Sequence, residues 1–466
     1  MRASSMVYTS TQLKALDIES ILHPMSSIGL LNHFGPQVMT GGKGVFVEDS
    51  DGNQFLSADA GLGATTLGFG RQELGEVMLE ACKNMGFYQT SVDSSNPTQI
   101  LLAQKLLNYM PDNITKVFFA SSGSEANETA IKILRLYNVG QGKPQKKQII
   151  TQDFSYHGST MFTSALTGME GFQNDFVIDR QDIISVPCPV FFSETSDASI
   201  EEAFVNKLIE ILRYRIEEVG ADNIAAFMAE PVLGCAGIVI PPKGYYDKVQ
   251  ALLKEYDILF VCDEVLCGYG RTGKMFGYQH TQLQPDIITS AKGLTSGYFP
   301  LSCVAISQDI WQVLSVQHNN FGVFSHGFTS CGHPVGAAVA LKTLEILEEE
   351  NLVENARLRG EQLLTGLKEE LNDNPYVGSI RGQGLMVGIE IKVDQQEIKD
   401  FNDFEKNLLS QTERACLDAG LLVRTARLSN SNFMVPPLTI SSAETELLIS
   451  RYVKGVETAI KNYDRI

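Results

Sequence analysis

With 466 residues, the chain is too long for one ordinary hydrophobic core, so we expect two or three domains that share a cleft. Its 44% hydrophobic and 20% charged residues are typical of a soluble globular protein, and no run approaches the roughly 18 consecutive apolar residues that span a membrane. The net charge of −18 argues against non-specific binding to nucleic acid, which depends on lysine and arginine side chains that neutralise phosphates.

The eight cysteines stand singly, without the spacing of metal ligands, which indicates reduced thiols and no bound metal. The amino end carries only Arg2 before Lys14 and has no apolar segment of the kind that directs secretion. We therefore expect a cytoplasmic protein.

The first 70 residues predict an arm followed by a hairpin. Residues 1–35 are mixed and polar, and two short strand-like runs at 45–47 and 54–56 flank a turn at 51–53. Residues 59–70 are rich in glycine, including Gly63, so the backbone there could approach a ligand closely or form a flexible loop. We expect residues 1–70 to pack with a smaller domain built from the end of the chain.

From residue 98 onward, segments of helical and strand character alternate, which predicts an α/β fold with a mostly parallel, doubly wound sheet over residues 71–333. The expected helices are 98–109, one from 125, 200–218 and 245–256, and the expected strands are 117–120, 148–151, 224–229, 258–262, 287–290 and 302–306. Residues 334–466 predict a smaller α+β domain, with helices at 335–350 and 353–372, β-rich segments at 377–380 and 385–391, and a terminal helix after the capping box of Ser441 and Glu444.

A carboxylate and a lysine each follow a predicted strand. Asp263 stands at the carboxyl end of strand 258–262, and Lys292 follows strand 287–290 with small neighbours on each side. Open α/β sheets bind ligands at these strand ends, so both side chains can face one crevice. Such a pair suits pyridoxal phosphate (PLP) chemistry, in which a lysine forms a Schiff base and an acid pairs with the pyridinium nitrogen. A capping aspartate and a solvated lysine are the plainer alternative.

A helix opens directly after strand 117–120 with Ser122, Gly123 and Ser124. The glycine frees the turn, the serines supply hydroxyls, and the helix amino end offers unpaired N–H groups to an anion. The pattern favours a phosphate site, although an ordinary serine cap explains part of it.

Further candidates end other predicted strands. Tyr156 and His157 follow strand 148–151, and the tyrosine could put its ring over a flat cofactor or belong to the core. Glu230 is another strand-end carboxylate, and Thr329 lies in a run of hydroxyl-bearing residues just before the change of domain.

Together these motifs resemble the class III aminotransferases of the PLP fold-type-I superfamily, and the likeness covers nearly the whole chain. The residues that carry it are DEVLCGYGRTG at 263–273 followed by Lys292, SGSEAN at 122–127, YHG at 156–158, EPV at 230–232, and HGFT at 326–329 with GHP at 332–334. The resemblance implies a PLP enzyme with a large cofactor domain, a small C-terminal domain, and a homodimer with shared active sites.

By this resemblance, Lys292 holds PLP as a Schiff base and Asp263 pairs with the pyridine nitrogen. Val265 lies under the ring and Tyr156 over it.

The phosphate, by the same resemblance, is held by Gly123 and Ser124 together with Thr329 of the partner subunit, so monomers are expected to be inactive. Ser122, His157 and Glu230 complete the expected cofactor site.

Within the family, the chain looks more like the omega-aminotransferases that use pyruvate than like ornithine or 4-aminobutyrate enzymes. This implies ping-pong transfer from an amine or omega-amino acid to a keto acid such as pyruvate. Leu266 stands where many members have glutamine, and Arg424 followed by residues 436–438 matches the omega pattern, with the arginine pairing with the carboxylate of the keto acid. Gly63 departs from the pattern, because several amine-preferring members have a bulky aromatic there. We expect a substrate pocket that is wider or shaped by other residues.

Two alternatives stay open on the sequence. A PLP-dependent aminomutase or racemase of the same fold would share nearly every cofactor motif. A non-catalytic PLP-binding or scaffold protein is disfavoured, because both Lys292 and Asp263 are present.

Overall fold

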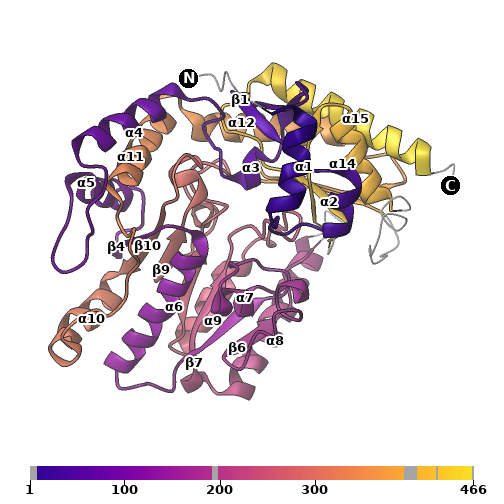
Figure 1. The fold of residues 1–466 in the computed structure, drawn as a ribbon. Coiled ribbons are helices and arrows are strands. Elements are labelled where there is room, and N and C mark those ends of the chain that lie inside the picture. The colour runs from indigo at the N-terminus through magenta and orange to yellow at the C-terminus, as the bar shows by residue number, and fades with distance from the viewer. Residues whose placement is uncertain (1–7, 192–197, 393–406, 427–428, 464–466) are drawn as a thin grey trace.

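The structure is a computed structural model that describes residues 8–191, 198–392, 407–426 and 429–463. The middle of the chain forms a large α/β body, and the two ends of the chain come together beside it (Figure 1). Within the described ranges, no helix is long and apolar enough to cross a membrane.

A seven-stranded sheet, counted over the described residues, forms the large body in the order β4-β10-β9-β8-β7-β5-β6. Strands β9, β8, β7, β5 and β6 run parallel, whereas β10 is antiparallel to both of its neighbours. This confirms the expected mostly parallel α/β sheet. The strands are β4 (Ile114–Ala120), β5 (Gln148–Gln152), β6 (Ile183–Val186), β7 (Ile224–Ala229), β8 (Leu259–Asp263), β9 (Ile287–Ser290) and β10 (Ser302–Ser307).

The reversal of β10 follows from a short connection. Residues 291–301 alone separate β9 from β10, and a parallel return needs a crossover of about a dozen residues or more, usually a helix. The chain therefore turns back at the carboxyl end of β9, and Lys292 lies at the start of that turn.

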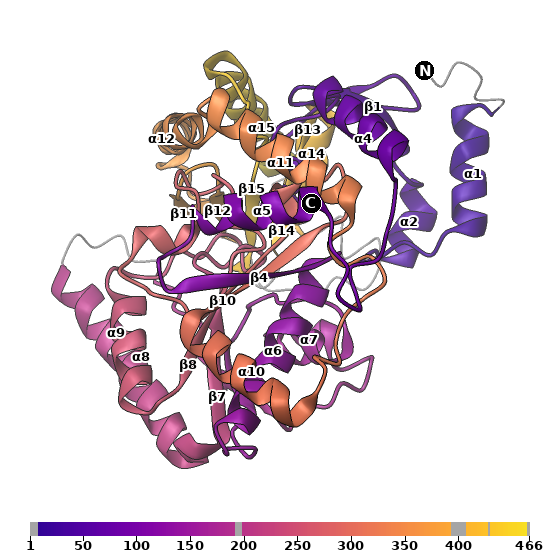
Figure 2. The same cartoon turned by 90° about the vertical axis from the view of Figure 1, so that its left-hand side faces the viewer.

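Alternate side chains of the central strands enter two different cores, as the pleat of a strand requires. Phe227 and Phe260 belong to the core that includes α9, whereas their neighbours Met228 and Val261 pack in the core that includes α6. Helices thus cover both faces of the sheet, with α6 and α10 on one face and α8 and α9 on the other (Figure 2). The helices of the large body are α6 (Gly123–Gly140), α7 (Met161–Leu166), α8 (Ala198–Val219), α9 (Tyr245–Glu255) and α10 (Gln308–Phe321).

Two smaller sheets contain strands from the ends of the chain, in the orders β1-β2-β3-β13 and β11-β12-β15-β14. In the first sheet, β3 runs parallel to β13, and the N–H of Leu56 donates to the carbonyl of Gly420 at 2.9 Å. The amino-terminal hairpin and a carboxyl-terminal strand therefore share one sheet, while the division at residues 70 and 333 stays a prediction. The strands are β1 (Met39–Lys43), β2 (Phe46–Asp49), β3 (Gln54–Ser57), β11 (Val377–Gly382), β12 (Val387–Ile391), β13 (Leu421–Leu422), β14 (Arg424–Ala426) and β15 (Ser431–Met434).

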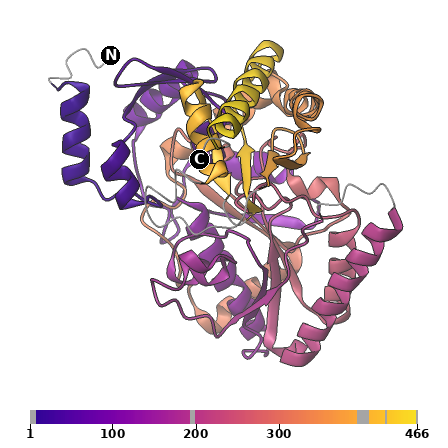
Figure 3. The same ribbon diagram turned by 90° about the vertical axis from the view of Figure 1, so that its right-hand side faces the viewer.

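Of the remaining helices, α12, α14 and α15 pack on the two smaller sheets, and α4 and α5 pack on α11, with α5 also against β4. Helix α1 stands at the edge of the molecule (Figures 2 and 3). None of the residues of α1 is buried, and Lys14 anchors the helix through an ion pair of 2.5 Å to Asp51. The helices expected from the sequence begin and end within two residues of those observed. These helices are α1 (Ser10–Ser20), α2 (Ile28–Phe34), α3 (Ala60–Gly63), α4 (Gln72–Asn84), α5 (Pro97–Leu107), α11 (Pro334–Glu349), α12 (Leu352–Leu371), α14 (Leu408–Asp418) and α15 (Ser442–Tyr463), with short 3₁₀ helices at Glu170–Phe172, Ala221–Asn223, Gly277–His280 and Lys292–Leu294.

Gly384, between β11 and β12, joins three segments by backbone contact. A Cβ on Gly360 of α12 would lie 2.1 Å from the carbonyl oxygen of Gly384. A Cβ on Gly384 itself would lie 2.3 Å from the carbonyl carbon of Thr272. The small sheet therefore sits directly against the segment that follows Asp263, with no room for a side chain between them.

Gly360→Ala is expected to lower stability by about 1–3 kcal/mol, because backbone atoms would have to move to admit the methyl group. The matched control is Gly75→Ala in α4, where a Cβ meets nothing within 4 Å. Alanine there should raise stability by up to about 1 kcal/mol through helix propensity. Thermal unfolding checks both, and a Gly360→Ala protein as stable as the parent would contradict the close packing.

Candidate active site

A cavity of about 960 Å³ opens where the carboxyl ends of the central strands face the small sheet. Cys235, Leu266 and Lys292 line it from the segments that follow β7, β8 and β9. Arg424 and Phe433 line it from β14 and β15. The cavity lining thus includes one lysine and two arginines, Arg180 and Arg424, and Lys292 and Arg424 come from different sheets.

Asp263 ends β8, where its carboxylate is buried with 2% of the residue exposed. The amide of Asn127 donates to its Oδ2 at 2.8 Å, and Nδ1 of His157 lies 2.8 Å from the same oxygen. The backbone N–H of Val265 donates to Oδ1 at 3.0 Å. Three segments of the chain therefore hold this carboxylate in one orientation.

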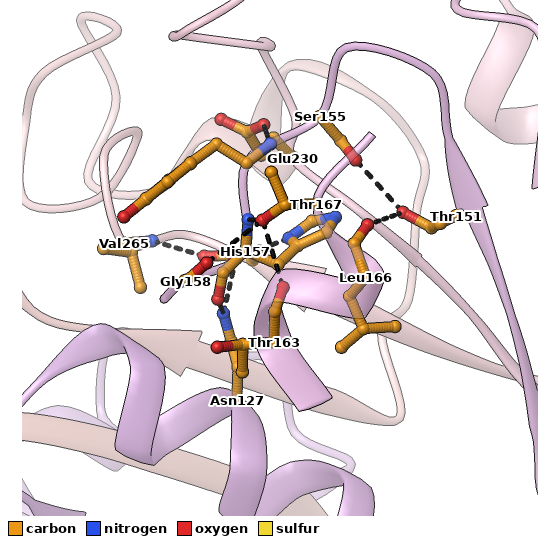
Figure 4. Close-up of polar contacts among 12 residues, drawn as sticks. Asn127, Thr151, Ser155, His157, Gly158, Thr163, Leu166, Thr167, Glu230 and Val265 are labelled. Atoms are coloured by element: carbon orange, nitrogen blue, oxygen red, sulfur yellow. Dashed lines mark hydrogen bonds and ion pairs between the residues drawn. The ribbon is translucent and has the colours of Figure 1, made fainter. Parts of the chain in front are cut away.

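His157 contacts the Asp263 carboxylate and also bonds to neighbouring segments. Figure 4 shows it among Asn127, Thr167 and Val265. Its N–H donates to the Thr167 hydroxyl at 3.0 Å, and its carbonyl accepts from the Asn127 amide at 2.7 Å. A carboxylate accepts from Nδ1 when the ring carries its proton there, which leaves Nε2 as an acceptor. Nε2 is buried and has no partner among the residues that the structure describes.

Lys292 follows β9 with a positive φ of 42°, a conformation that most residues avoid. Its carbonyl accepts from the N–H of Thr295 at 3.2 Å and of Gly297 at 3.3 Å, so the turn is closed on itself. The turn holds the backbone at the cavity wall, and the lysine side chain lines the cavity.

The amino end of α6 lies against the segment after Asp263. A Cβ on Gly123 would lie 2.9 Å from Val265 Cγ1, so glycine permits the approach. Ser122 caps the helix by accepting from the N–H of Glu125 at 3.2 Å, as the plainer reading of this serine expected. The Ser124 hydroxyl accepts from the N–H of Ser159 at 3.1 Å.

Glu230 and Tyr156 are joined through the backbone. The N–H of Tyr156 donates to Glu230 Oε1 at 2.9 Å, and the N–H of Gly234 donates to Oε2 at 3.1 Å. Burial raises the pKa of Glu230 to about 7, although His157 opposes the rise. The tyrosine ring lines the cavity, edge-on to Phe172 with ring centres 5.4 Å apart. Glu230 thus orients the segment that carries Tyr156.

Cys235 is a lining residue that the sequence did not single out. Burial and the charge of Glu230 raise its pKa to about 11, while Lys292 and Arg424 oppose the rise. Both cations therefore lie near this uncharged thiol. Within the described ranges, no ion pair or side-chain hydrogen bond engages the Arg424 guanidinium.

Of the predicted site residues, Tyr156, Lys292 and Arg424 line this cavity. The others do not, namely Gly63, Ser122, Gly123, Ser124, His157, Glu230, Asp263, Val265 and Thr329. Gly63 is buried behind the wall, where the side chains of Leu62 and Leu266 reach the cavity instead. Thr329 is exposed on the segment before α11.

Residues 32–456 match the sequence model of the family Aminotransferase class-III. The chain belongs to this family. It is 38% identical to the diaminobutyrate–2-oxoglutarate transaminase of Halomonas elongata, with 90% of each chain covered. It is 37% identical to the putrescine–pyruvate aminotransferase of Pseudomonas aeruginosa, with 94% of each covered.

The omega-transaminase of Pseudomonas jessenii in complex with PMP has the same fold, with a TM-score of 0.91 and 35% identity over 96% of this chain and 98% of that one. The expected fold type I is thereby confirmed, and so is the expected activity: the protein is a PLP-dependent aminotransferase.

Asp263→Asn is expected to preserve the fold but reduce turnover about a thousandfold, which corresponds to roughly 4 kcal/mol in the transition state. An amide offers N–H groups where the carboxylate now accepts from Asn127 and His157, and it cannot pair with a cationic ring nitrogen. Steady-state kinetics on folded protein measure the effect.

Glu264→Gln is the matched control, since Glu264 is the adjacent buried carboxyl and accepts from the N–H groups of Gly277 and Tyr278. We expect its turnover to stay within tenfold of the parent. A loss below tenfold in Asp263→Asn would make the Asp263 carboxylate structural.

Proposed function

We propose that this aminotransferase moves an amino group from an amine with an apolar substituent to a small keto acid such as pyruvate. The observation that carries the proposal is that Lys292 and Arg424 line one cavity whose exposed wall is mostly apolar. The other lining arginine, Arg180, already donates to the carbonyl of Ala165 and the hydroxyl of Ser185. An amine substrate can react at the lysine end, and a carboxylate can bind at the guanidinium end.

Arg424 is the residue that suits the keto acid. The Arg424 guanidinium is half-buried, which is costly unless it meets an anion, and its planar fork can bond both oxygens of a carboxylate. The names of the two relatives point the same way, since pyruvate and 2-oxoglutarate both carry a carboxylate. When the substrate has no carboxylate, the Arg424 side chain would swing away toward Glu230 or solvent. Each Glu230 oxygen accepts from one backbone N–H and can accept a further bond.

The residues around Asp263 fit the PLP of this family. Asp263 would hold the proton of the ring nitrogen, and Val265 and Tyr156 would enclose the ring from two sides. The amino end of α6 approaches Val265 closely, and glycine at position 123 permits this. The first N–H groups of a helix have no carbonyl partner within the helix, so those of α6 can bind a phosphate.

Ser124 supplies a hydroxyl beside those N–H groups, while Ser122 serves as the helix cap. His157 would act through Asp263, which it contacts. When bound, PLP supplies the electron sink that stabilises charge at the substrate carbon.

The chain supplies the proton transfer. The Lys292 amine takes a proton from the substrate carbon and delivers it to the acceptor carbon, as general base and then as general acid. Because the closed turn fixes the lysine backbone, the amine reaches the same point of the cavity in both half-reactions. The apolar walls limit water at that point. The two substrates react in turn, so the kinetics should be ping-pong.

A homodimer is part of the proposal, with Thr329 of the partner subunit completing the phosphate site. In its own chain, Thr329 is exposed and lies outside the cavity. The same region exposes large apolar side chains: Tyr88 is 55% and Val92 89% exposed, and the hydroxyl of Thr90 donates to the carbonyl of Cys331 at 2.8 Å. A partner that covers this apolar surface would bring its own Thr329 close to the site.

We also place the enzyme in the cytoplasm. All eight cysteines are free thiols in the structure, and reduced thiols are typical of a reducing compartment.

Lys292→Ala is expected to abolish turnover, because it removes the amine that binds PLP and moves the proton. The parent should be yellow, with a cofactor absorbance that an amine donor bleaches and pyruvate restores, whereas the variant should not complete the cycle. The exposed Lys83 of α4 is the control, and Lys83→Ala should behave as the parent. Turnover of the Lys292→Ala variant at the rate of the parent would contradict the proposal.

Arg424→Ala is expected to slow the half-reaction with pyruvate at least tenfold more than the half-reaction with an uncharged amine, because only the keto acid carries a carboxylate. Single-turnover rates for each half-reaction measure this. Arg424→Lys should rescue only partly, since lysine lacks the planar fork. Arg414→Ala, an exposed arginine in α14, should change neither rate. Equal losses in both half-reactions would remove Arg424 from the substrate site.

A further inference from the structure

Leu266 is the cavity residue whose surroundings are the least expected from the sequence. It follows Asp263 by three positions, and its side chain is part of the cavity wall beside Lys292. Its neighbour Cys267 is fully buried and donates to the carbonyl of Val232 at 3.3 Å, which fixes the backbone of this turn. Leu266 therefore projects from a rigid segment.

The two methyl groups of Leu266 fit against two glycines. A Cβ on Gly63 would lie 2.5 Å from Cδ1, and a Cβ on Gly234 would lie 2.1 Å from Cδ2. Real side-chain carbons do not approach so closely, so a residue larger than glycine at either position would have to displace the leucine. The leucine thus takes the space that side chains at positions 63 and 234 would fill.

The two glycines differ in what else constrains them. Gly63 has a φ of 73°, a conformation that L-residues rarely adopt, and its carbonyl accepts from Arg271 Nη2 at 3.4 Å. Gly234 has no positive φ, and the atoms nearest to a Cβ there are two carbons of Leu266 and, at an ordinary contact distance of 3.7 Å, Glu230 Oε2. A methyl group at position 234 would therefore press first on the leucine.

We infer that Leu266, seated between Gly63 and Gly234, sets the upper size of the amine substituent that the cavity accepts. This inference rests on the proposed function and goes beyond it by naming the residue that limits substrate size. Truncating the leucine enlarges the cavity itself, because the side chain is partly exposed to it. Pushing the leucine forward from position 234 narrows the cavity.

The test compares 1-phenylethylamine with 1-phenylbutylamine, which differ by two methylene groups, as donors to pyruvate. Leu266→Ala should raise the ratio of kcat/KM for the larger to the smaller amine at least tenfold, since one methylene in a fitted apolar pocket changes this ratio by about tenfold or more. Gly234→Ala should lower the ratio. The double variant should regain most of the Leu266→Ala ratio.

Met386→Ala is the matched control, because Met386 is fully buried in the same apolar cluster but does not line the cavity. The Met386→Ala substitution should lower Tm and leave the ratio of kcat/KM for the two amines unchanged. A folded Leu266→Ala protein with the parent ratio would overturn the inference, as would a Met386→Ala protein with the same shift in ratio.

Thermal unfolding gives a second readout that needs no turnover. Gly234→Ala should lower Tm in the parent background and should not lower it further when Leu266 is alanine, because the methyl group then has room. Equal losses of Tm in both backgrounds would overturn the geometry. If the parent protein transfers no amino group from either amine to pyruvate, the proposed function is contradicted, and with it the limit on amine size. If Gly234→Ala lowers Tm equally with and without Leu266, only the packing of Leu266 is contradicted.

Discussion

The buried carboxylate of Asp263 determines where the rest of the site lies. A carboxylate removed from water is costly unless hydrogen-bond donors replace the water, and here Asn127, His157 and the N–H of Val265 do so. Each donor belongs to a segment that also carries another part of the expected cofactor site. Asn127 stands one turn beyond the amino end of α6, His157 is next to Tyr156, and Val265 packs against Gly123. One carboxylate thereby places the helix end, the aromatic ring and the apolar floor relative to each other.

The sequence could predict the strand ends but not the contacts between distant segments. Asp263 and Lys292 were recognisable because buried parallel strands are short apolar runs and ligands collect at their carboxyl ends. The direction of β10 was not predicted, since it depends on how short its connection to β9 is. Cys235 was missed as a cavity residue. Leu266 was expected near the cofactor by resemblance, but nothing in the local pattern shows that it meets Gly63 from a segment about 200 residues earlier.

Glu230 shows a second kind of information that the sequence pattern does not contain, namely the role of a residue within the site. Its place at a strand end put it among the expected cofactor-binding residues, and that role stays a prediction. In the structure both of its oxygens accept from backbone N–H groups. A carboxylate pattern identifies the site but cannot separate a residue that touches the ligand from one that orients its neighbours. Asn127 illustrates the same point, since it was part of a recognised motif and its bond to Asp263 became visible only with α6 in place.

Arg271 joins the two parts of the molecule that the cavity separates. It is fully buried, and its guanidinium donates to the carbonyls of Gly63, Leu385 and Pro436. Burial lowers its pKa to about 9. The three carbonyls come from the end of α3, the turn between β11 and β12, and the segment after β15, so one guanidinium holds three separate segments together.

The amine and the carboxylate of a substrate thus meet different sheets, with Lys292 on the large one and Arg424 on the small one. The separation of these two ends is set by contacts away from the cavity, namely the bonds of Arg271 and the backbone contact of Gly384 with Thr272. Leu266 lines the same cavity but supplies neither the amine nor the guanidinium. The size of the amine substituent can therefore change by substitution at Leu266 while the positions that bind the amine and the carboxylate remain the same.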